Sequence, residues 1–147
     1  MDTDFEDAKK LVEETIKKLG LDPAGCRAPS TDAQAAWTLK RGSASVLVTV
    51  THHQDEDETY LRVASPVVTL PADKARHGAL FRHLLELNAG GLANAAFGIV
   101  GERIVAVSER PVEGLGAAEV EQTVKHLAAV ADTFDDRLEK EFGASKA

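Results

Sequence analysis

The sequence AAFGIVGERIVAVSERPV, residues 95–112, contains two apolar runs separated by Gly101-Glu102. Glycine at the first position of a two-residue loop favours a type II′ turn, which joins two antiparallel strands tightly. Because side chains alternate along a strand, the turn also decides which residues share a face. One face would carry Phe97, Ile99, Ile104 and Ala106, and the other Val105 and Val107. A hairpin that is apolar on both faces indicates a sheet that is covered on both sides.

Residues 36–68 contain three more strand-like runs. In the first run, Trp37 and Leu39 alternate with polar residues, and the turn at residues 41–43 follows. The second run places valines at alternate positions, Val46, Val48 and Val50. The third, ETYLRVASPVV, is rich in aromatic and β-branched residues, which favour strands. Because Pro66 lacks an N–H group, we expect that part of the third run at a sheet edge or a bulge.

An amphipathic helix is predicted for residues 3–19. Its apolar residues recur at three- and four-residue spacing and share one face: Phe5, Ala8, Leu11, Val12, Ile16 and Leu19. Thr3 and Glu6 have the spacing of a capping box, and Gly20 suits the left-handed position that ends a helix. Residues 21–33 are rich in Pro, Gly, Ser and Asp, and we expect them to form a loop.

Two further helices are predicted nearer the C-terminus. The first covers residues 71–91, with Pro71 in its first turn and Gly90-Gly91 at its end. Its less polar face carries His77, Leu80, Phe81, Leu84, Leu87 and Asn88. The second covers residues 117–142, and residues 144–147 are expected to form a loose tail.

The order of these elements is helix, three strands, helix, two strands, helix. Strands mixed with helices in this order favour an α+β fold with an antiparallel sheet packed by helices. The length of 147 residues is that of one ordinary domain. Residues 1–147 are therefore predicted to form a single domain.

Residues 48–63, VTVTHHQDEDETYLRV, place two histidines before a run of acidic residues. Successive strand side chains point to opposite faces, so His52 and His53 are not expected to reach one metal ion. A zinc site needs three or four ligands, and the acidic run lacks the spacing of an EF-hand calcium loop. We interpret the segment as a charged hairpin loop. Metal sensing at residues 52–58, through His52, His53 and Asp55, is the alternative.

The rest of the sequence contains no catalytic signature. Arg27 beside Cys26 would lower the thiol pKa, but the neighbouring sequence supplies no base with an orienting third group. The serines fall outside G-x-S-x-G, and the histidines fall outside H-E-x-x-H. The sequence therefore predicts no catalytic residue, no metal ligand and no cofactor. An enzyme whose site assembles from dispersed Arg and His residues is the competing hypothesis.

Acidic residues outnumber basic ones, 24 to 17, which gives a formal net charge of −7. Phosphate repels such a chain, and the basic residues form no stripe, so neither nucleic acid nor a membrane is an expected partner. No apolar run is long enough for a membrane span, and the polar N-terminus does not resemble a secretory signal. One cysteine excludes an internal disulfide, and we expect a cytoplasmic protein.

Three segments carry a family resemblance: YLRVASPVV, LFRHLLELNAGGLANAAFGIVGERIVAVSERPVEGL and EVEQTVKHLAAVADTFDDRLEKEFG. Their features are a strand ending in Pro66-Val67, a helix closing on Leu87-Asn88, a hairpin with an apolar first arm, and a final helix with ADTFDDRL. Together they resemble the YbjN family and, less closely, the Tir-chaperone (CesT-like) group of type III secretion chaperones. The resemblance covers roughly residues 33–142 and indicates fold more firmly than function.

The resemblance implies a compact α-β-β-β-α-β-β-α domain with a curved antiparallel sheet and no catalytic residues. It also implies a small, acidic, cytosolic dimer that holds an extended segment of a partner protein. We therefore expect a non-enzymatic, chaperone-like or regulatory protein that binds a polypeptide through apolar surface. Because a second subunit could cover the open face of the hairpin, we predict a homodimer built on the second helix and the following hairpin. The predicted contacts are Leu84, Leu87, Phe97, Val105 and Val107.

Overall fold

The computed structural model describes residues 3–147, apart from the Thr3 side chain. Its longer elements are α1 (Thr3–Lys18), β2 (Gln34–Arg41), β3 (Ala44–His53), β4 (Glu58–Thr69), α3 (His77–Gly90), β5 (Ala96–Val100), β6 (Arg103–Pro111) and α4 (Ala117–Phe142). The shorter elements are α2 (Pro23–Cys26), β1 (Arg27–Ala28), the 3₁₀ turn η1 (Lys74–Arg76) and β7 (Ser145–Lys146). The longer elements follow the predicted order. The predicted capping box of Thr3 and Glu6 lies outside the described side chains.

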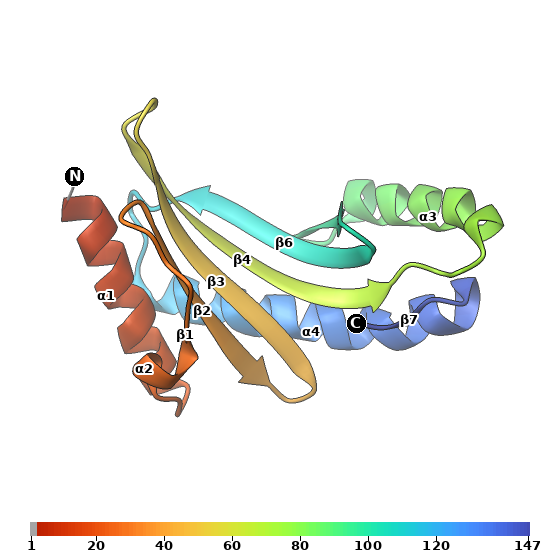
Figure 1. Ribbon diagram of the computed structural model, residues 1–147, viewed down its shortest axis with the longest axis horizontal. Helices are drawn as coiled ribbons and strands as arrows, with labels where there is room; N and C mark the ends of the chain where they lie inside the picture. The colour runs from red at the N-terminus through yellow and green to blue at the C-terminus, as the bar shows by residue number, and fades with distance from the viewer. Residues whose placement is uncertain (1–2) are drawn as a thin grey trace.

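The strands form one antiparallel sheet in the order β1-β2-β3-β4-β6-β5, and β7 pairs with β4 off this path. Figure 1 shows the sheet curving along the molecule, with the β3–β4 hairpin projecting from the body. This arrangement confirms the predicted α+β fold with a curved antiparallel sheet. None of the helices in the described chain is long and apolar enough to cross a membrane.

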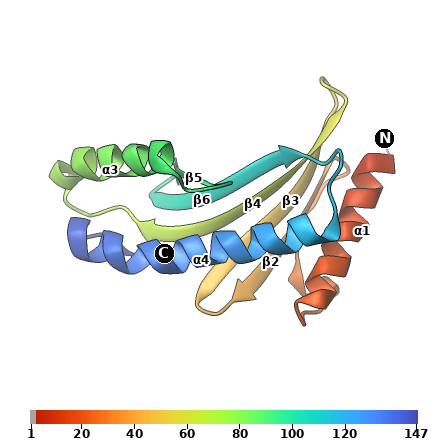
Figure 2. The ribbon, with the colours of Figure 1, turned by 180° about the vertical axis from the view of Figure 1, so that it is seen from behind.

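Helices α1 and α4 pack on the same face of the sheet (Figure 2). The side chains between them and the sheet include Trp37, Leu39, Val46, Val48, Val50, Leu61 and Val63, each at most 2% exposed. Burying one aliphatic side chain of this size contributes roughly 1.5–3 kcal/mol, so this face supplies much of the stability. In Figure 1, β3 and the end of β4 pass in front of α4, and no helix lies in front of β3, β4 or β6.

The β5–β6 hairpin has the predicted register. Its facing pairs are Phe97 with Ala106 and Ile99 with Ile104. Gly101 has a left-handed φ of 60°, which a first turn position of type II′ requires. The Phe97 ring meets the Phe134 ring of α4 at a right-angled contact, with 5.3 Å between centroids. This contact packs the β5–β6 hairpin against α4.

Pro66 lies at a β-bulge in β4, as predicted. The pairing of β4 with β6 shifts register just after this residue. On its other side, β4 pairs with β3 only as far as Leu47 and Ala64. Beyond that point the Ser65 hydroxyl donates to the Ser45 carbonyl at 2.8 Å. Pro66 therefore lies both at a bulge toward β6 and at the part of β4 that β3 leaves unpaired, where a missing N–H is tolerated.

Residues 21–33 are more ordered than the predicted loop, because they contain α2 and β1. The Asp22 carboxylate accepts a hydrogen bond from the Ala24 N–H at 3.2 Å and caps α2. Arg27, in β1, forms an ion pair with Glu13 of α1 at 3.0 Å. Elements of two and four residues are too short to produce a hydrophobic period, so no pattern in the sequence predicts them.

The second helix begins later than predicted. Pro71 precedes η1, and the Asp73 carboxylate accepts from the Ala75 N–H at 3.0 Å. An aspartate that caps the backbone is a stronger start signal here than the proline. The predicted end is confirmed, since α3 stops at Gly90 and Gly91 has a φ of 120°.

Residues 144–147 form an ordered end of the chain and not the predicted loose tail. Ser145 and Lys146 pair with Thr69 and Val68 of β4. Ala144 is 4% exposed within the core, which accounts for its order. A two-residue strand carries no alternation that the sequence could reveal.

Candidate functional site

Helix α3 is apolar on two sides. Leu80 and Leu84 are buried in the core. The outer stripe of α3 consists of Gly78, Phe81, Leu85 and Ala89, which follow one another at three- and four-residue spacing and line a shallow groove. Leu85 is 68% exposed. A helix that is apolar on both sides normally packs against something on both sides, and the outer stripe is therefore a candidate contact surface.

The β5–β6 turn adds apolar surface near α3. Ile99 is 51% exposed and Val100 is 57% exposed. Strand β5 is the last strand of the sheet, and the Asn88 amide of α3 bonds the backbone of Phe97 at its outer edge. Backbone groups alternate in direction along an antiparallel strand, so Ile99 directs its N–H and C=O to the same edge as Phe97.

The five predicted contact residues do not form one surface. Leu84 and Phe97 belong to the core at 5% and 7% exposure, and Leu87 is half-buried beside it. Val105 is 7% exposed and Val107 is half-buried, and strand alternation places both on the open face of the sheet. Their role as partner contacts stays a prediction.

The exposed apolar residues that the sequence reasoning did not single out are Leu85, Val100 and Leu47, which is 40% exposed. A signal for Leu85 was available. Leu84 and Leu85 are adjacent, and neighbouring helical residues point about 100° apart, so with Leu84 and Leu80 at the centre of the buried face Leu85 lies at its margin or beyond. Val100 adjoins the tight turn, where a polar residue is usual.

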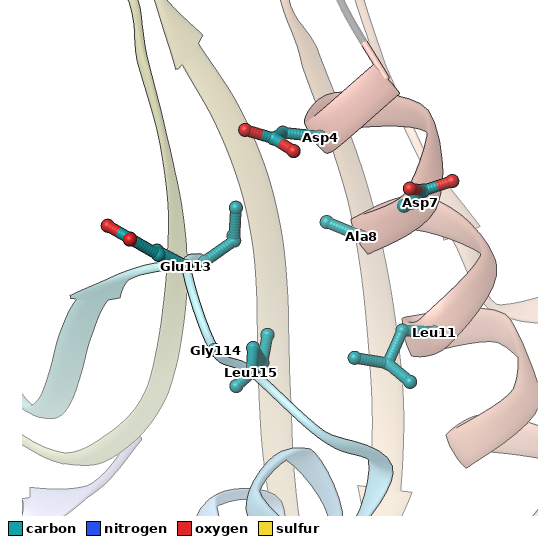
Figure 3. A pocket seen from close by; sticks show the side chains of 8 residues that line it. Asp4, Asp7, Ala8, Leu11, Glu113, Gly114 and Leu115 are labelled. Atoms are coloured by element: carbon teal, nitrogen blue, oxygen red, sulfur yellow. The ribbon is translucent and has the colours of Figure 1, made fainter.

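A groove of about 370 Å³ lies between α1 and the loop that joins β6 to α4. Figure 3 shows Leu11 of α1 and Leu115 of the loop extending toward each other, with Asp4 at the far end of the groove. The lining residues are Asp4, Asp7, Ala8, Leu11, Val112, Glu113, Gly114 and Leu115. The groove beside α1, as we call this site, therefore combines an aliphatic floor with a carboxylate rim, in which Asp4 points toward the loop and the Asp7 and Glu113 carboxylates point outward.

The carboxylates of the rim are not neutralised by the rest of the described chain. The ion pairs between residues 3–147 use other carboxylates, and none uses Asp4, Asp7 or Glu113. The nearby Arg110 guanidinium donates to the Glu113 backbone carbonyl at 3.0 Å. Uncompensated negative charge beside an aliphatic surface favours a ligand with a cation next to an apolar side chain.

The β3–β4 loop is a charged hairpin loop, as predicted. His52 Nδ1 lies 3.0 Å from the Thr59 hydroxyl, and His52 Nε2 lies 3.7 Å from Asp57 Oδ1. The His53 ring instead meets the Tyr60 ring at 5.2 Å between centroids. The two histidines thus have separate surroundings. Within residues 3–147, no group of three or more His, Cys, Asp or Glu side chains is placed to hold a metal ion.

Cys26 is a half-buried free thiol at the end of α2. Burial first, and the charge of Asp22 second, raise the pKa of Cys26 above its ordinary value. The lowering expected from Arg27 is therefore wrong, and the Arg27 guanidinium instead forms an ion pair with Glu13. A thiol that stays protonated is a poor nucleophile.

These features define a class of protein: a small α+β binding domain whose helix-backed sheet leaves one face, one helix stripe and one groove accessible. A family profile described as TY-Chap1, "T3SS (YopN, CesT) and YbjN peptide-binding chaperone 1", matches residues 6–147. The chain belongs to this family of peptide-binding chaperones. The match confirms the resemblance seen in the sequence.

Solved structures of type III secretion chaperones share the fold. The ExsC-ExsE complex matches with a TM-score of 0.66 at 16% identity, covering 92% of this chain and 96% of that chain. The HopA1-SchA chaperone-effector complex matches with a TM-score of 0.61 at 14% identity, covering 92% and 98%. The ExoU-SpcU complex of Pseudomonas aeruginosa matches with a TM-score of 0.55 at 15% identity, covering 87% and 98%. Comparison with curated protein sequences gives no match.

Proposed function

We propose that this protein is a single-domain, cytoplasmic, homodimeric chaperone-like protein that binds an extended segment of a partner polypeptide. The groove beside α1 carries the proposal, because its aliphatic floor and unpaired carboxylate rim suit a peptide with both apolar and basic side chains. Membership of a peptide-binding chaperone family supports the same function. The similar HopA1-SchA structure is a chaperone bound to an effector, which is the kind of partner proposed here.

The groove fits a particular kind of segment. An apolar side chain would lie between Leu11 and Leu115, where its burial provides affinity. A lysine or arginine next to it would approach Asp4, Asp7 or Glu113, which provides orientation and faster association. Binding should therefore weaken as salt is added, since exposed charges about 10 Å apart are largely screened at 0.1 M salt.

The outer stripe of α3 supports self-association. In a symmetric dimer each subunit contributes the same surface, so the stripe would pack against its own copy and the exposed Val100 would extend the contact. The free outer sides of Phe81 and Leu85 would then lose their exposure to water. A cytoplasmic location agrees with the one free thiol, Cys26.

We also infer that the protein acts by binding and not by catalysis. The family description names peptide binding. The lining residues of the groove beside α1 are carboxylates and small or aliphatic residues, with no Ser, Thr, Cys, Lys or His among them. The raised pKa of Cys26 also argues against the one thiol of the chain as a nucleophile.

The groove is tested with a fluorescent peptide that carries Lys-Leu-Arg, compared with the same peptide carrying Glu-Leu-Glu. The basic peptide should bind more tightly, and Asp7→Lys should weaken it on the order of tenfold, a change of 1.4 kcal/mol. Glu14→Lys is the matched control, because Glu14 is exposed on α1 and outside the groove. Equal binding of both peptides, or equal loss in both variants, would contradict the proposal.

The dimer is tested separately by light scattering at micromolar concentration. Leu85→Lys should convert a dimer to a monomer, because a charge in a buried stripe lacks a partner. Ala129→Lys, on an exposed position of α4, should leave the dimer intact. A natural chain that is monomeric under these conditions would rule the dimer out.

A further inference from the structure

Strand β4 has an internal edge that β3 leaves uncovered. The two strands pair from His53–Glu58 to Leu47–Ala64, and β3 then follows β2 alone. On its other side β4 stays paired with β6 as far as Thr69. Residues 65–69 of β4 therefore present one edge that no neighbouring strand of the main sheet fills.

Strand β7 covers only part of this edge. Ser145 pairs with Thr69 and Lys146 pairs with Val68, in antiparallel direction. Continuing the same direction, the next positions of a strand would lie beside Val67 and then toward Ser65. Strand β7 therefore occupies this edge of β4 over two residues, and the edge continues beyond them.

A hollow of about 270 Å³ lies where such a strand would continue. It is bounded by the start of β3, the bulge of β4, the middle of α4 and the end of the described chain. The lining residues are Lys40, Ser43, Ala44, Ser45, Pro66, Val67, Arg103, Ala131, Asp132, Asp135, Lys146 and Ala147. Cations and carboxylates are both present, so the hollow selects for backbone shape more than for charge.

The contacts that hold β7 are few. Ala144 is buried, the ladder spans two residue pairs, and Lys146 Nζ lies 3.1 Å from Asp136 Oδ1. The hydrogen bond and charge of Asp136 raise the pKa of Lys146, but both side chains of this pair are about 60% exposed. Exposed ion pairs contribute little, so a longer strand with more backbone hydrogen bonds can compete with β7.

We propose that the β4 edge at residues 65–69 is a strand-binding site that β7 occupies within the same chain, and that an extended segment of the partner polypeptide takes the whole edge when β7 leaves. The proposal rests on the proposed function only in taking a polypeptide as the partner. The fit of Ala144 and β7 indicates which kind of peptide segment this site can bind. The bound segment runs antiparallel to β4, begins with a small apolar residue at the position of Ala144, and continues as at least four extended residues.

The probe for this site is the labelled peptide Gly-Ala-Ser-Lys-Ala-Thr-Val, which copies residues 143–147 and extends them along the hollow. Its affinity depends on how often β7 is away, because the apparent dissociation constant equals the intrinsic dissociation constant divided by the fraction of competent sites. Ser145→Pro removes a backbone donor from β7. This variant should bind the probe about tenfold more tightly than the natural chain if β7 occupies the site nine-tenths of the time.

A second variant locks β7 in place. Thr69→Cys with Ser145→Cys, in a Cys26→Ser background, joins two directly facing residues. Facing residues of an antiparallel pair are roughly 4.5–5.5 Å apart at Cα, which lies within the range that a disulfide spans. The oxidised form should bind the probe at least about tenfold less tightly than the same protein after reduction, because the competent fraction falls toward zero.

Each outcome decides the proposal. Equal binding by the oxidised and reduced forms would overturn it, and so would unchanged binding by Ser145→Pro. The oxidised and reduced forms carry the same substitutions and share any folding defect, so tighter binding after reduction reports the release of β7. Lys125→Ala is the matched control, since it removes an exposed ion pair with Glu121 on α4 whose residues do not line the hollow, and it should leave binding unchanged. Failure here would leave the Lys-Leu-Arg peptide binding of the α1 groove intact, so the two proposals fail independently.

Discussion

The side-chain amide of Asn88 binds both backbone groups of Phe97. The Phe97 N–H donates to Asn88 Oδ1 at 2.7 Å, and Asn88 Nδ2 donates to the Phe97 carbonyl at 3.2 Å. One amide thus takes the place that a neighbouring strand would have at the outer edge of β5. It also fixes the end of α3 to the sheet, which determines where the outer stripe of that helix lies.

Asn88→Ala should destabilise the protein by about 1–3 kcal/mol, because the part-buried backbone groups of Phe97 lose their partners. Asn88→Asp is the informative comparison. It keeps the acceptor for the Phe97 N–H and loses only the donor, so it should destabilise the protein less than alanine does at neutral pH. Urea unfolding of the three proteins measures the difference. Equal stability of Asn88→Ala and the natural chain would show that the pair of bonds contributes nothing.

The indole of Trp37 provides a second prediction. Glu13 Oε2 accepts from Trp37 Nε1 at 3.1 Å and from Arg27 Nε at 3.1 Å, and Trp37 is 2% exposed. Glu13→Ala should therefore cost about 1–3 kcal/mol, the usual penalty for an unsatisfied buried donor. Glu13→Gln keeps an acceptor and should cost less. Trp37 is the one tryptophan of the chain, so its fluorescence follows unfolding directly. Glu14→Ala, on the exposed side of α1, is expected to leave stability unchanged.

The Tyr60 phenol should lose its proton at a higher pH than an ordinary tyrosine. The charge of Glu58 first, then burial and the charge of Glu56, raise the pKa of Tyr60 above its ordinary value of 10.0. Since Tyr60 is the one tyrosine, absorbance near the phenolate band during a base titration reports this residue alone. Glu58→Gln should move the titration to lower pH, and Glu102→Gln, in the remote β5–β6 turn, should not.

The folded state holds the Tyr60 proton more tightly than the unfolded state. Any stabilisation from this shift is therefore complete below the unfolded pKa and is lost as pH rises through the folded pKa. A titration at or below the ordinary value would contradict the arrangement of carboxylates around Tyr60.

Gly143 should not tolerate a side chain. Its φ of 72° is left-handed, and a Cβ there would also require the flexible end of the Arg76 side chain, 2.9 Å away, to move. Gly143→Ala is expected to cost about 1–2 kcal/mol, the penalty for an L-residue in this conformation. Gly90→Ala is the matched control, because no atom outside its own helix lies within 4 Å of the added carbon and its φ is not positive. That variant should be neutral or more stable by up to about 1 kcal/mol, which thermal unfolding of both proteins would measure.

Features that repeat along the chain could be predicted from the sequence. The alternation of Val46, Val48 and Val50, each 0% exposed, identified β3, and the glycine at residue 101 fixed the register of the β5–β6 hairpin. Pro66 marked the bulge in β4 because its missing N–H has a defined consequence for pairing. Each of these signals involves residues that are close together in the sequence, and such local patterns can be recognised in a single sequence.

The surfaces could not be predicted in the same way. The groove beside α1 joins residues near 4–11 to residues near 112–115, and no local pattern connects them. Leu84 and Phe97 were reasonable contact candidates by type, yet both belong to the core, where the Phe97 ring contacts Phe134 of α4. Strand β7 is ordered by Ala144 and by an edge of β4 that exists only because β3 leaves it. Such placements depend on tertiary packing, which overrides local preference.

Figure 1 places α1 and α3 at opposite ends of the long helix α4. Helix α4 has 26 residues, which corresponds to roughly 39 Å at 1.5 Å per residue. Two subunits joined through α3 would hold their grooves far apart, on the outer ends of the pair. A bivalent partner would then gain avidity only if the linker between its two motifs could reach across both subunits, since effective concentration falls to near zero for a linker that is too short. The length of the rigid helix α4 would in this way determine how long the linker of a polypeptide must be for tight binding.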